Sequence, residues 1–354
     1  MEVSPLLHAL CRPLRLARTD LGASARKTWT IAPGLRTRRR RAHYLDGQLE
    51  RVIATHRETS MPYEIARLSD GFVDHAPTIG FSFANARLLD GCLYAGRLRY
   101  VTSDKRPAYL DLRGVEAREL GVLSSSYIGN RYFGHWMTDD STLQRAARRI
   151  GPPIAGVRPS YVHREGYERI LDLGRDFVER ARFDELVVID DHGMNPDRVA
   201  RLRELRACFA PYRAAQPATG VYIRHGKSGE PRHLQGEAEV EACLARRGFV
   251  SIEPESMTPE QVVRVLSGAS TVVGLESSAM APGILALADG GAWLNLLPPE
   301  RFNNIFKDYL DALEMHYGFV VGQPVDGGFR LDTGEIERTL DLLDRARAQA
   351  RAAA

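Results

Sequence analysis

The second half of the chain alternates short apolar runs with longer helix-like runs, and this rhythm limits the possible folds more than any other feature. The apolar runs span residues 221–224, 248–252, 271–274 and 292–296, and the helix-like runs span 237–247, 258–266 and 278–288. Because strand and helix repeat in this order, they predict right-handed βαβ crossovers and a parallel sheet. We therefore expect this half of the chain to be Rossmann-like.

Two loops at the ends of these strands carry polar groups, at the edge where open α/β sheets bind ligands. The first loop contains Arg224, Lys227 and Arg232 around Gly226. Guanidinium groups bind phosphate through two parallel hydrogen bonds, so this loop is suited to holding a diphosphate. The competing interpretation is a solvated, charged hairpin loop.

The second loop contains Glu276, Ser277 and Ser278, directly before a helix-like run. Its two hydroxyl groups and the backbone N–H groups at the helix start can bind an anion. Glu276 is placed to accept hydrogen bonds from ribose hydroxyls, as acidic residues at the edge of such sheets do. Alternatively, Ser277 only caps the helix.

A cluster of aromatic and ionisable residues, 129–140, lies in the first half. It follows a run, 122–128, that is typical of a buried strand, and it precedes a helix-like run, 141–150. His135 and Asp139 are spaced i, i+4, so a helix places them on one face, within hydrogen-bonding reach. A carboxylate that orients an imidazole makes a general base near neutral pH. In the other interpretation, His135 and Trp136 pack the helix start and Asp139 caps it.

The rest of the first half predicts a strand-rich opening followed by mixed elements. Asp-Gly pairs within the apolar runs 44–52 and 84–94 indicate two hairpins. Downstream we expect a strand over 154–162, a helix over 167–179, a buried parallel strand over 186–191 that ends in Asp190 and Asp191, and a helix over 196–210.

The length of 354 residues exceeds one ordinary core and predicts two domains. The small, proline-containing stretch 210–220 is typical of a linker between them. We expect a basic N-terminal segment over 1–43, a first α/β domain over 44–210, a linker over 211–219, the Rossmann-like domain over 220–330 and a helical segment over 331–354. That last helix has an apolar stripe of Ile336, Leu340, Leu343 and Ala350.

The formal net charge is only +3, but basic residues concentrate near the N-terminus, above all in the run 36–41. We expect a solvated, poorly ordered tail. Two alternatives stay open: residues 6–16 mix leucines with arginines, as a peripheral interfacial helix does, and the polybasic run could contact anionic lipid or an acidic partner. Nucleic acid is not expected as a partner, because aromatic residues are not interleaved with the run.

The four cysteines lie far apart and form neither a zinc pattern nor a disulfide framework, which fits a reducing cytosol. The chain has no apolar stretch near 20 residues and no continuous apolar secretory signal, so we expect neither a transmembrane helix nor export. The expected location is cytoplasmic, with the basic segment allowing contact with the inner face of the membrane.

Several motifs together resemble glycosyltransferase family 61. Residues 129–139, GNRYFGHWMTD, resemble the family signature GNYFHWLLD with an extra Gly134. A strand ending in Arg224, the stretch 248–282 (GFVSIEPESMTPEQVVRVLSGASTVVGLESSAMAP) and the pair Asp308-Tyr309 before 315–320 (MHYGFV) match further family motifs in order. The resemblance covers roughly residues 44–321; Ser277 and Pro282 stand where the family usually has glycine and asparagine.

The resemblance implies a GT-B-like α/β fold, with two Rossmann-like domains facing each other across a cleft and the last helix crossing back to the first domain. It implies an inverting transfer from a nucleotide-sugar donor to a glycan or lipid-linked glycan acceptor in cell-surface polysaccharide synthesis. His135 or Asp139 would be the base, with Asn130 and Trp136 on the acceptor side. Arg224, Lys227 and Arg232 would bind donor phosphates, and Glu276, Ser277 and Ser278 the nucleotide. No metal and no other cofactor is implied.

Two rival hypotheses belong to different classes. The departures at Gly134 and Ser277 favour a catalytically silent GT-B-like protein that binds a nucleotide sugar or glycan. A polybasic scaffold that docks on membrane or nucleic acid is the other; it predicts that removal of residues 1–43 abolishes function while His135→Ala has no effect. Asp190 and Asp191 could also imitate an acidic metal site.

Overall fold

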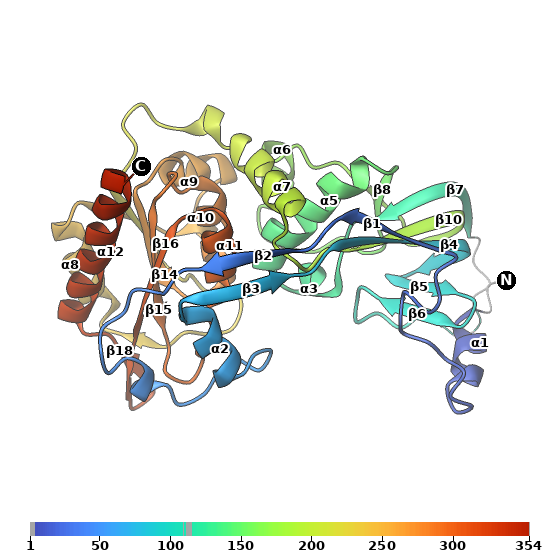
Figure 1. The fold of residues 1–354 in the computed structure, drawn as a ribbon, viewed down its shortest axis with the longest axis horizontal. Helices are drawn as coiled ribbons and strands as arrows, with labels where there is room; N and C mark the ends of the chain where they lie inside the picture. Colours follow the sequence, from blue (N-terminus) through green and yellow to red (C-terminus); the bar gives the residue numbers. More distant parts are fainter. Residues whose placement is uncertain (1–3, 109, 111–114, 354) are drawn as a thin grey trace. The chain divides into compact units, whose positions relative to one another are not determined.

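The computed structural model describes residues 4–108, 110 and 115–353, and the chain divides into two compact units (Figure 1). Unit 1 combines residues Met1–Leu35 with His75–Leu202, and unit 2 combines Arg36–Asp74 with Arg203–Ala354. Neither unit is a continuous stretch of sequence. The chain is a mixed α/β protein, as the alternation of apolar runs predicted.

Unit 2 contains the expected parallel sheet. Its strands follow the order β13-β11-β14-β15-β16, and every neighbouring pair is parallel. The strands are β11 (Gly220–Ile223), β13 (Phe249–Ile252), β14 (Thr271–Leu275), β15 (Ala292–Leu297) and β16 (His316–Val321). Strands 14, 15 and 16 are buried throughout, which is why they appear in the sequence as continuous apolar runs.

Helices cover both faces of this sheet in Figure 1. They are α8 (Glu237–Arg246), α9 (Pro259–Leu266), α10 (Ala281–Ala286), α11 (Phe306–Ala312) and α12 (Thr333–Ala353), with short 3₁₀ turns η3 (Ala210–Tyr212), η4 (Pro254–Ser256) and η5 (Ser278–Met280). Thr258 and Gln261 form a reciprocal capping box that fixes the start of α9. A small side sheet joins β12 (Leu234–Gln235), β18 (Gly328–Arg330) and β17 (Gln323–Val325).

The last helix packs in the core of unit 2. Ile336, Leu340 and Leu343 of α12 are buried in the core of unit 2, together with residues of its parallel sheet and of α8. The predicted apolar stripe is therefore confirmed for these three residues, whereas Ala350 is exposed. Because the sheet of unit 2 buries this stripe, α12 stabilises unit 2.

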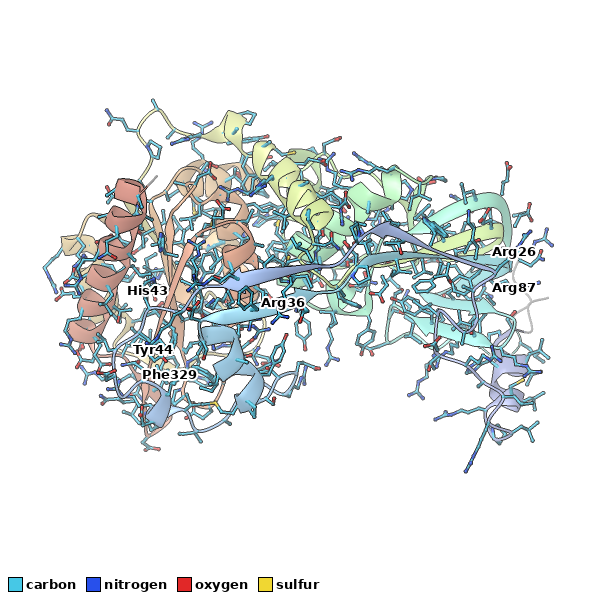
Figure 2. All side chains as sticks on the ribbon, in the orientation of Figure 1. Arg26, Arg36, His43, Tyr44, Arg87 and Phe329 are labelled. Atoms are coloured by element: carbon cyan, nitrogen blue, oxygen red, sulfur yellow. The ribbon has the colours of Figure 1, made fainter. Side chains whose placement is uncertain are left out.

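Residues 36–74 belong to unit 2, although they lie far from its other residues in sequence. They contain β2 (Leu35–Arg39), η1 (Leu49–Arg51), α2 (Met61–Leu68) and β3 (Gly71–His75), and β2 pairs with β3. Figure 2 labels His43 and Tyr44: the His43 N–H donates to Tyr317 O at 2.9 Å, and the Tyr44 ring stacks on Phe319 at 4.6 Å. The hairpin that we predicted at 44–52 is absent; a 3₁₀ turn takes its place.

The basic N-terminal segment is not the solvated tail that we predicted. Residues Lys27–Ala32 form β1, which pairs with β4 of unit 1, and the arginine run begins within β2. Arg36 lies 3.8 Å from Asp74, Arg38 lies 2.8 Å from Asp70, and Arg39 lies 3.8 Å from Asp308. Neighbouring carboxylates thus balance part of the positive charge, which the linear sequence does not reveal.

Unit 1 is built on a mixed sheet of the order β6-β5-β4-β10-β7-β8-β9, with β1 (Lys27–Ala32) also paired to β4. The strands are β4 (Thr78–Leu89), β5 (Cys92–Ala95), β6 (Leu98–Val101), β7 (Glu116–Leu123), β8 (Pro153–Ala155), β9 (Asp176–Phe177) and β10 (Arg180–Asp190). From β10 to β9 the neighbouring strands are parallel, whereas β4 pairs with both β10 and β5 antiparallel. Only the parallel part matches the expected Rossmann-like pattern.

The Asp90-Gly91 hairpin predicted within 84–94 is confirmed. It joins β4 to β5, and both turn residues have positive φ, 50° and 80°, as a tight hairpin turn requires. Other predicted boundaries are displaced: the strand predicted over 122–128 is β7, which ends at Leu123, and the helix predicted over 167–179 is α6 (Arg164–Ile170) followed by β9. The helix predicted over 196–210 is α7 (Pro196–Ala207).

Among the residues that the structure describes, none of the helices combines the length and apolar character needed to cross a membrane. The remaining helices of unit 1 are α1 (Ser4–Cys11), α3 (Tyr127–Arg131), α4 (Phe133–His135), the π-helical turn η2 (Trp136–Asp140) and α5 (Ser141–Arg148). The helices from α3 to α5 connect β7 to its parallel neighbour β8, so they begin at the carboxyl end of β7.

Candidate active site

The connection after β7 positions the His135 side chain. Ser126 ends the turn that follows β7, and its hydroxyl accepts a hydrogen bond from Gly129 N at 2.8 Å, which caps α3. Tyr132 then interrupts the helix with an extended conformation before α4 begins. The capped start and the break at Tyr132 together set the direction from which His135 enters the site.

A π-helical turn, Trp136–Asp140, follows His135 directly. A π-turn contains more residues than an α-turn and occurs most often at functional sites. Gly134 is an extra residue relative to the family signature. A turn that contains more residues can accommodate such an insertion. The carbonyl groups of this region are satisfied by side chains: Thr138 Oγ1 donates to Gly134 O and Ser141 Oγ donates to Trp136 O, each at 3.0 Å.

His135 and Asp139 form a hydrogen-bonded pair, with 2.6 Å between Nδ1 and Oδ2. Their side chains are 27% and 26% exposed, so the pair is accessible to a substrate. The other carboxylate oxygen of Asp139 accepts a charge-assisted hydrogen bond from Arg198, which comes from α7 after β10. Burial lowers the pKa of His135, but the hydrogen bond and the charge of Asp139 outweigh it, so the pKa is raised.

A second layer of buried groups fixes Arg198. Its Nη1 donates to Asp191 O at 2.5 Å, and its side chain is 4% exposed. The Asp191 carboxylate receives two hydrogen bonds from Arg201, at 2.7 and 2.9 Å, and one from Thr78 at 2.7 Å. Burial raises the pKa of Asp191, but the hydrogen bonds from these donors lower it by more than burial raises it. The pKa of Asp191 therefore lies below its ordinary value. Asp191 therefore supports the site, while Asp190 lies 3.1 Å from His192.

Asp140 lies beside the pair and is completely buried. Its Oδ1 accepts hydrogen bonds from Ser126 N at 3.1 Å and Ser126 Oγ at 2.7 Å, which ties η2 to the start of α3. Its Oδ2 has no hydrogen-bond partner among the residues that the structure describes. Burial raises the pKa of Asp140 to about 7, although the charge of Arg175 and the Ser126 hydrogen bonds oppose the shift.

The two residues expected on the acceptor side lie in different surroundings. Asn130 Nδ2 donates to Thr102 O at 2.7 Å, and its Oδ1 is buried with no hydrogen-bond partner in the described part of the chain. Trp136 is fully buried and stacks on Phe133 with 5.7 Å between ring centroids, close to Tyr161. The ring of Trp136 thus packs the helix against its neighbours in unit 1.

In unit 2, the end of β14 places Glu276 in a buried ionic cluster. Its Oε2 accepts from Arg301 Nε at 2.9 Å and from Arg232 Nη2 at 3.3 Å, and its Oε1 accepts from Asn303 at 3.0 Å. Arg301 also pairs with Glu230. The Glu276 and Arg232 side chains are each 6% exposed, whereas Arg301 is 21% exposed. Burial lowers the pKa of Arg232, although the charge of Glu276 opposes the shift.

Arg224 and Lys227 make separate contacts. The Arg224 guanidinium lies 3.4 Å from Glu241 and 3.9 Å from Glu253 and is 42% exposed. The backbone N–H groups of Lys227 and Ser228 donate to the Glu255 carboxylate at 3.0 and 2.7 Å. Backbone hydrogen bonds lower the pKa of Glu255 despite the opposing effect of burial. The loop predicted to bind a diphosphate thus binds an anion of the chain itself.

The serines after Glu276 start a 3₁₀ turn, and Ser277 is its first flanking residue. The Ser277 side chain makes no capping hydrogen bond, and within residues 4–108, 110 and 115–353 its buried Oγ has no hydrogen-bond partner. Ser278 is partly exposed. The hydroxyl of Ser277 is therefore not used to cap the turn, although the alternative interpretation of the sequence predicted that it would be.

The described part of the chain contains no group of three or more His, Cys, Asp or Glu side chains that could hold a metal ion. The two clusters together contain a histidine, carboxylates and guanidinium groups, which can exchange protons and bind anionic groups. Residues 133–291 match the family model Glycosyltransferase 61.

Residues 133–291 are a glycosyltransferase family 61 domain. The domain makes the chain a glycosyltransferase, which acts on a sugar donor and an acceptor. The matched range contains His135, Asp139 and Arg198 of unit 1 and Arg232 and Glu276 of unit 2. No curated protein matches the chain.

Sequence reasoning missed three side chains that the structure adds to these clusters of the glycosyltransferase: Arg198, Arg301 and Asn303. Arg198 lies 59 residues after Asp139, so the helical spacing that revealed His135 could not reveal it. Arg301 and Asn303 follow β15, whose neighbour in the sheet is β14. The rule that ligands bind at strand ends, applied to the strand at 292–296 as well, would have found them.

Proposed function

We propose that this glycosyltransferase is an inverting, metal-independent enzyme that uses a nucleotide-sugar donor to extend a cell-surface polysaccharide. In this proposal the base comes from unit 1 and the donor phosphates bind unit 2, as in GT-B enzymes. The observation that carries the proposal is the His135–Asp139–Arg198 chain, in which a partly exposed imidazole is oriented by a carboxylate that is itself held by a buried arginine.

The chain of hydrogen bonds assigns a role to each member of the pair. Asp139 uses one oxygen for His135 and the other for Arg198, so its negative charge is retained and its position is fixed. Its hydrogen bond to Nδ1 leaves Nε2 of His135 to accept a proton. We therefore assign His135 as the general base and Asp139 as the residue that orients it.

The transfer proceeds in one displacement. The acceptor hydroxyl gives its proton to His135 Nε2, and its oxygen forms a bond to the anomeric carbon of the donor. The bond from that carbon to the diphosphate oxygen breaks on the opposite face, and its electron pair leaves with the nucleoside diphosphate. The anomeric configuration is therefore inverted, and arginine side chains of unit 2 neutralise the developing charge.

Arg301 is the donor-binding candidate that the contacts favour most in unit 2. Two arginines donate hydrogen bonds to Glu276, and Arg301 is the more exposed: its side chain is 21% exposed, whereas that of Arg232 is 6% exposed. Arg224 is more exposed than either, but it faces Glu241 and Glu253. We therefore expect Arg301 to contribute more to phosphate binding than Arg224, since charge-assisted hydrogen bonds contribute about 1.5–3 kcal/mol each.

The test is a thermal-shift screen of the full chain against UDP, GDP, CMP and their common sugar conjugates, with and without EDTA. A nucleotide that binds the native state raises the melting temperature. The proposal expects one nucleotide class to stabilise the protein equally in EDTA, and Arg301→Ala to weaken that nucleotide at least tenfold more than Arg224→Ala. Stabilisation that EDTA removes would contradict metal independence, and a folded protein that binds none of these nucleotides would overturn the donor assignment.

A further inference from the structure

The N-terminal helix α1 and the turn after it expose a row of leucines. Leu7, Leu10 and Leu14 are 54%, 59% and 68% exposed, and Leu16 is 40% exposed. The first three recur at spacings of three and four residues, which places Leu7 and Leu10 on one helical face that continues into Leu14. So many large apolar side chains in a short segment form a patch, and apolar patches of this kind mark sites of interaction.

The opposite side of this segment is attached to unit 1. Pro5 is buried, and the His8 ring packs edge-on against Tyr94 of β5 at 6.1 Å. After the turn, Arg18 N donates to Arg97 O at 2.9 Å and Arg99 N donates to Arg18 O at 3.0 Å, beside β6 (Figure 1). The leucine face is therefore held at a defined place on unit 1 while its side chains stay exposed.

The charged side chains of residues 4–16 are all positive. Residues 4–16 include Arg12 and Arg15, both exposed, and no acidic residue. Apolar side chains that penetrate the lipid surface, with arginines at their side to meet anionic headgroups, are the features of an interfacial helix. A second copy of the chain would fit less well, because two such faces would bring like charges together.

We propose that the leucine face of residues 4–16 docks unit 1 on an anionic lipid surface. Leu7, Leu10 and Leu14 enter the boundary between headgroups and acyl chains, and Arg12 and Arg15 pair with lipid phosphates. The proposal concerns unit 1 alone, so it stands whichever sugar donor the enzyme uses. It also assigns a purpose to apolar side chains that would otherwise remain exposed to water.

The experiment is flotation of the full-length protein with vesicles of phosphatidylcholine alone and of phosphatidylcholine with 30% phosphatidylglycerol. We expect flotation with the anionic vesicles only, and a loss of at least tenfold in the bound fraction for the triple variant Leu7→Gln, Leu10→Gln, Leu14→Gln. The double variant Arg12→Gln, Arg15→Gln should bind several-fold less and lose its sensitivity to salt. Val162→Gln is the matched control, since Val162 is 55% exposed on the same unit.

The melting temperature of each variant separates lost binding from lost folding; we expect it to be unchanged, because the substituted side chains are exposed. Equal flotation of the wild type and the triple variant would overturn the proposal, as would a wild type that ignores anionic vesicles. Light scattering tests the other occupant: a dimer that the triple variant abolishes would show that a second copy covers the leucines, and would also overturn it.

Discussion

The two polar clusters of this glycosyltransferase lie in equivalent places but differ in exposure. Each is at the carboxyl ends of neighbouring parallel strands: the His135 cluster follows β7 and β10, and the Glu276 cluster follows β14 and β15. In the first, His135 and Asp139 are about a quarter exposed. In the second, Glu276 and Arg232 are almost completely buried, and their charges compensate each other. Similar positions in a sheet thus carry clusters of different physical character.

The difference in exposure indicates that the His135 cluster is suited to exchange protons and the Glu276 cluster to hold charge. An exposed imidazole can meet a substrate hydroxyl, and its carboxylate partner adjusts its pKa. The buried pair of Glu276 and Arg232, to which the partly exposed Arg301 also bonds, is costly to disturb, because removal of one partner leaves an uncompensated buried charge. The following four predictions test this distinction, beginning with the largest expected effect.

Replacing His135 should damage catalysis most. His135→Gln removes the general base, so we expect kcat to fall by roughly 10²–10⁴-fold while the fold is retained. The measurement is the release of nucleoside diphosphate from the donor that the thermal-shift screen identifies. His192→Gln is the matched control, because His192 also pairs with an aspartate, at 3.1 Å, but is 90% exposed. A His135→Gln enzyme within threefold of the wild type would exclude His135 as the base.

Replacing Glu276 should damage stability most. Glu276→Gln leaves the buried Arg232 and the partly buried Arg301 without their shared carboxylate, so we expect a loss of about 3 kcal/mol in the free energy of unfolding. Denaturant unfolding gives the value. Glu239→Gln provides the control, since the Glu239–Arg330 pair is more than half exposed on both sides and should contribute nothing measurable. Equal unfolding midpoints for the two variants would show that the cluster does not hold charge as we describe.

Replacing Asp139 should change both the rate and its pH dependence. In Asp139→Asn we expect roughly a 100-fold lower kcat/KM, because the imidazole loses its orientation. Asp139 raises the His135 pKa and burial lowers it, so the variant has a lower pKa. The base works only when neutral, and activity is lost as the pH falls through this pKa; the acid limb should therefore move to lower pH. If the acid limb of the pH–rate profile does not move, the group that titrates in this limb is not His135.

Replacing Asp140 should have the smallest effect, and it should change stability alone. Its pKa rises from the model-peptide value of 3.8 to about 7 on folding. The folded state therefore holds a proton that the unfolded state releases, and this contribution to stability is lost as the pH rises from about 4 through about 7. Asparagine cannot lose a proton, so the melting temperature of Asp140→Asn relative to the wild type should rise by roughly a few degrees between pH 5 and pH 8. A constant difference would contradict the shifted pKa.

The fold of unit 2 was predictable because four of its five parallel strands are buried throughout and the strands alternate with helices. Four of the five strands were predicted within about two residues. Unit 1 was less predictable, since half of its sheet is antiparallel and pairs strands that are distant in sequence. The strand at Glu116–Leu123 was placed too late because three of its first four residues are charged, so only its last residues stand out as an apolar run.

The candidate site residues also divide into contacts that local sequence spacing predicts and contacts that it does not. The contact between His135 and Asp139 spans four residues of one helical segment, so spacing alone predicted it. Arg232 and Glu276 were both chosen from strand ends and meet, but Arg224 turns to Glu241 and Lys227 N to Glu255. Which of several cations at a strand end reaches a given carboxylate depends on rotamers and loop conformation, and the sequence does not determine these.

The discontinuity of unit 2 has a consequence for synthesis on the ribosome. Residues 36–74 leave the exit tunnel early, yet Glu64 accepts hydrogen bonds from Asn304, and Gln48 and Arg51 bond to Glu335. These pairs are separated by 240 to 287 residues, so the early segment must wait, without its native partners, until nearly the whole polypeptide has emerged. Domains usually fold one after another during translation, and contacts this distant slow that process. The nascent chain should therefore depend on chaperones until its last helix is released.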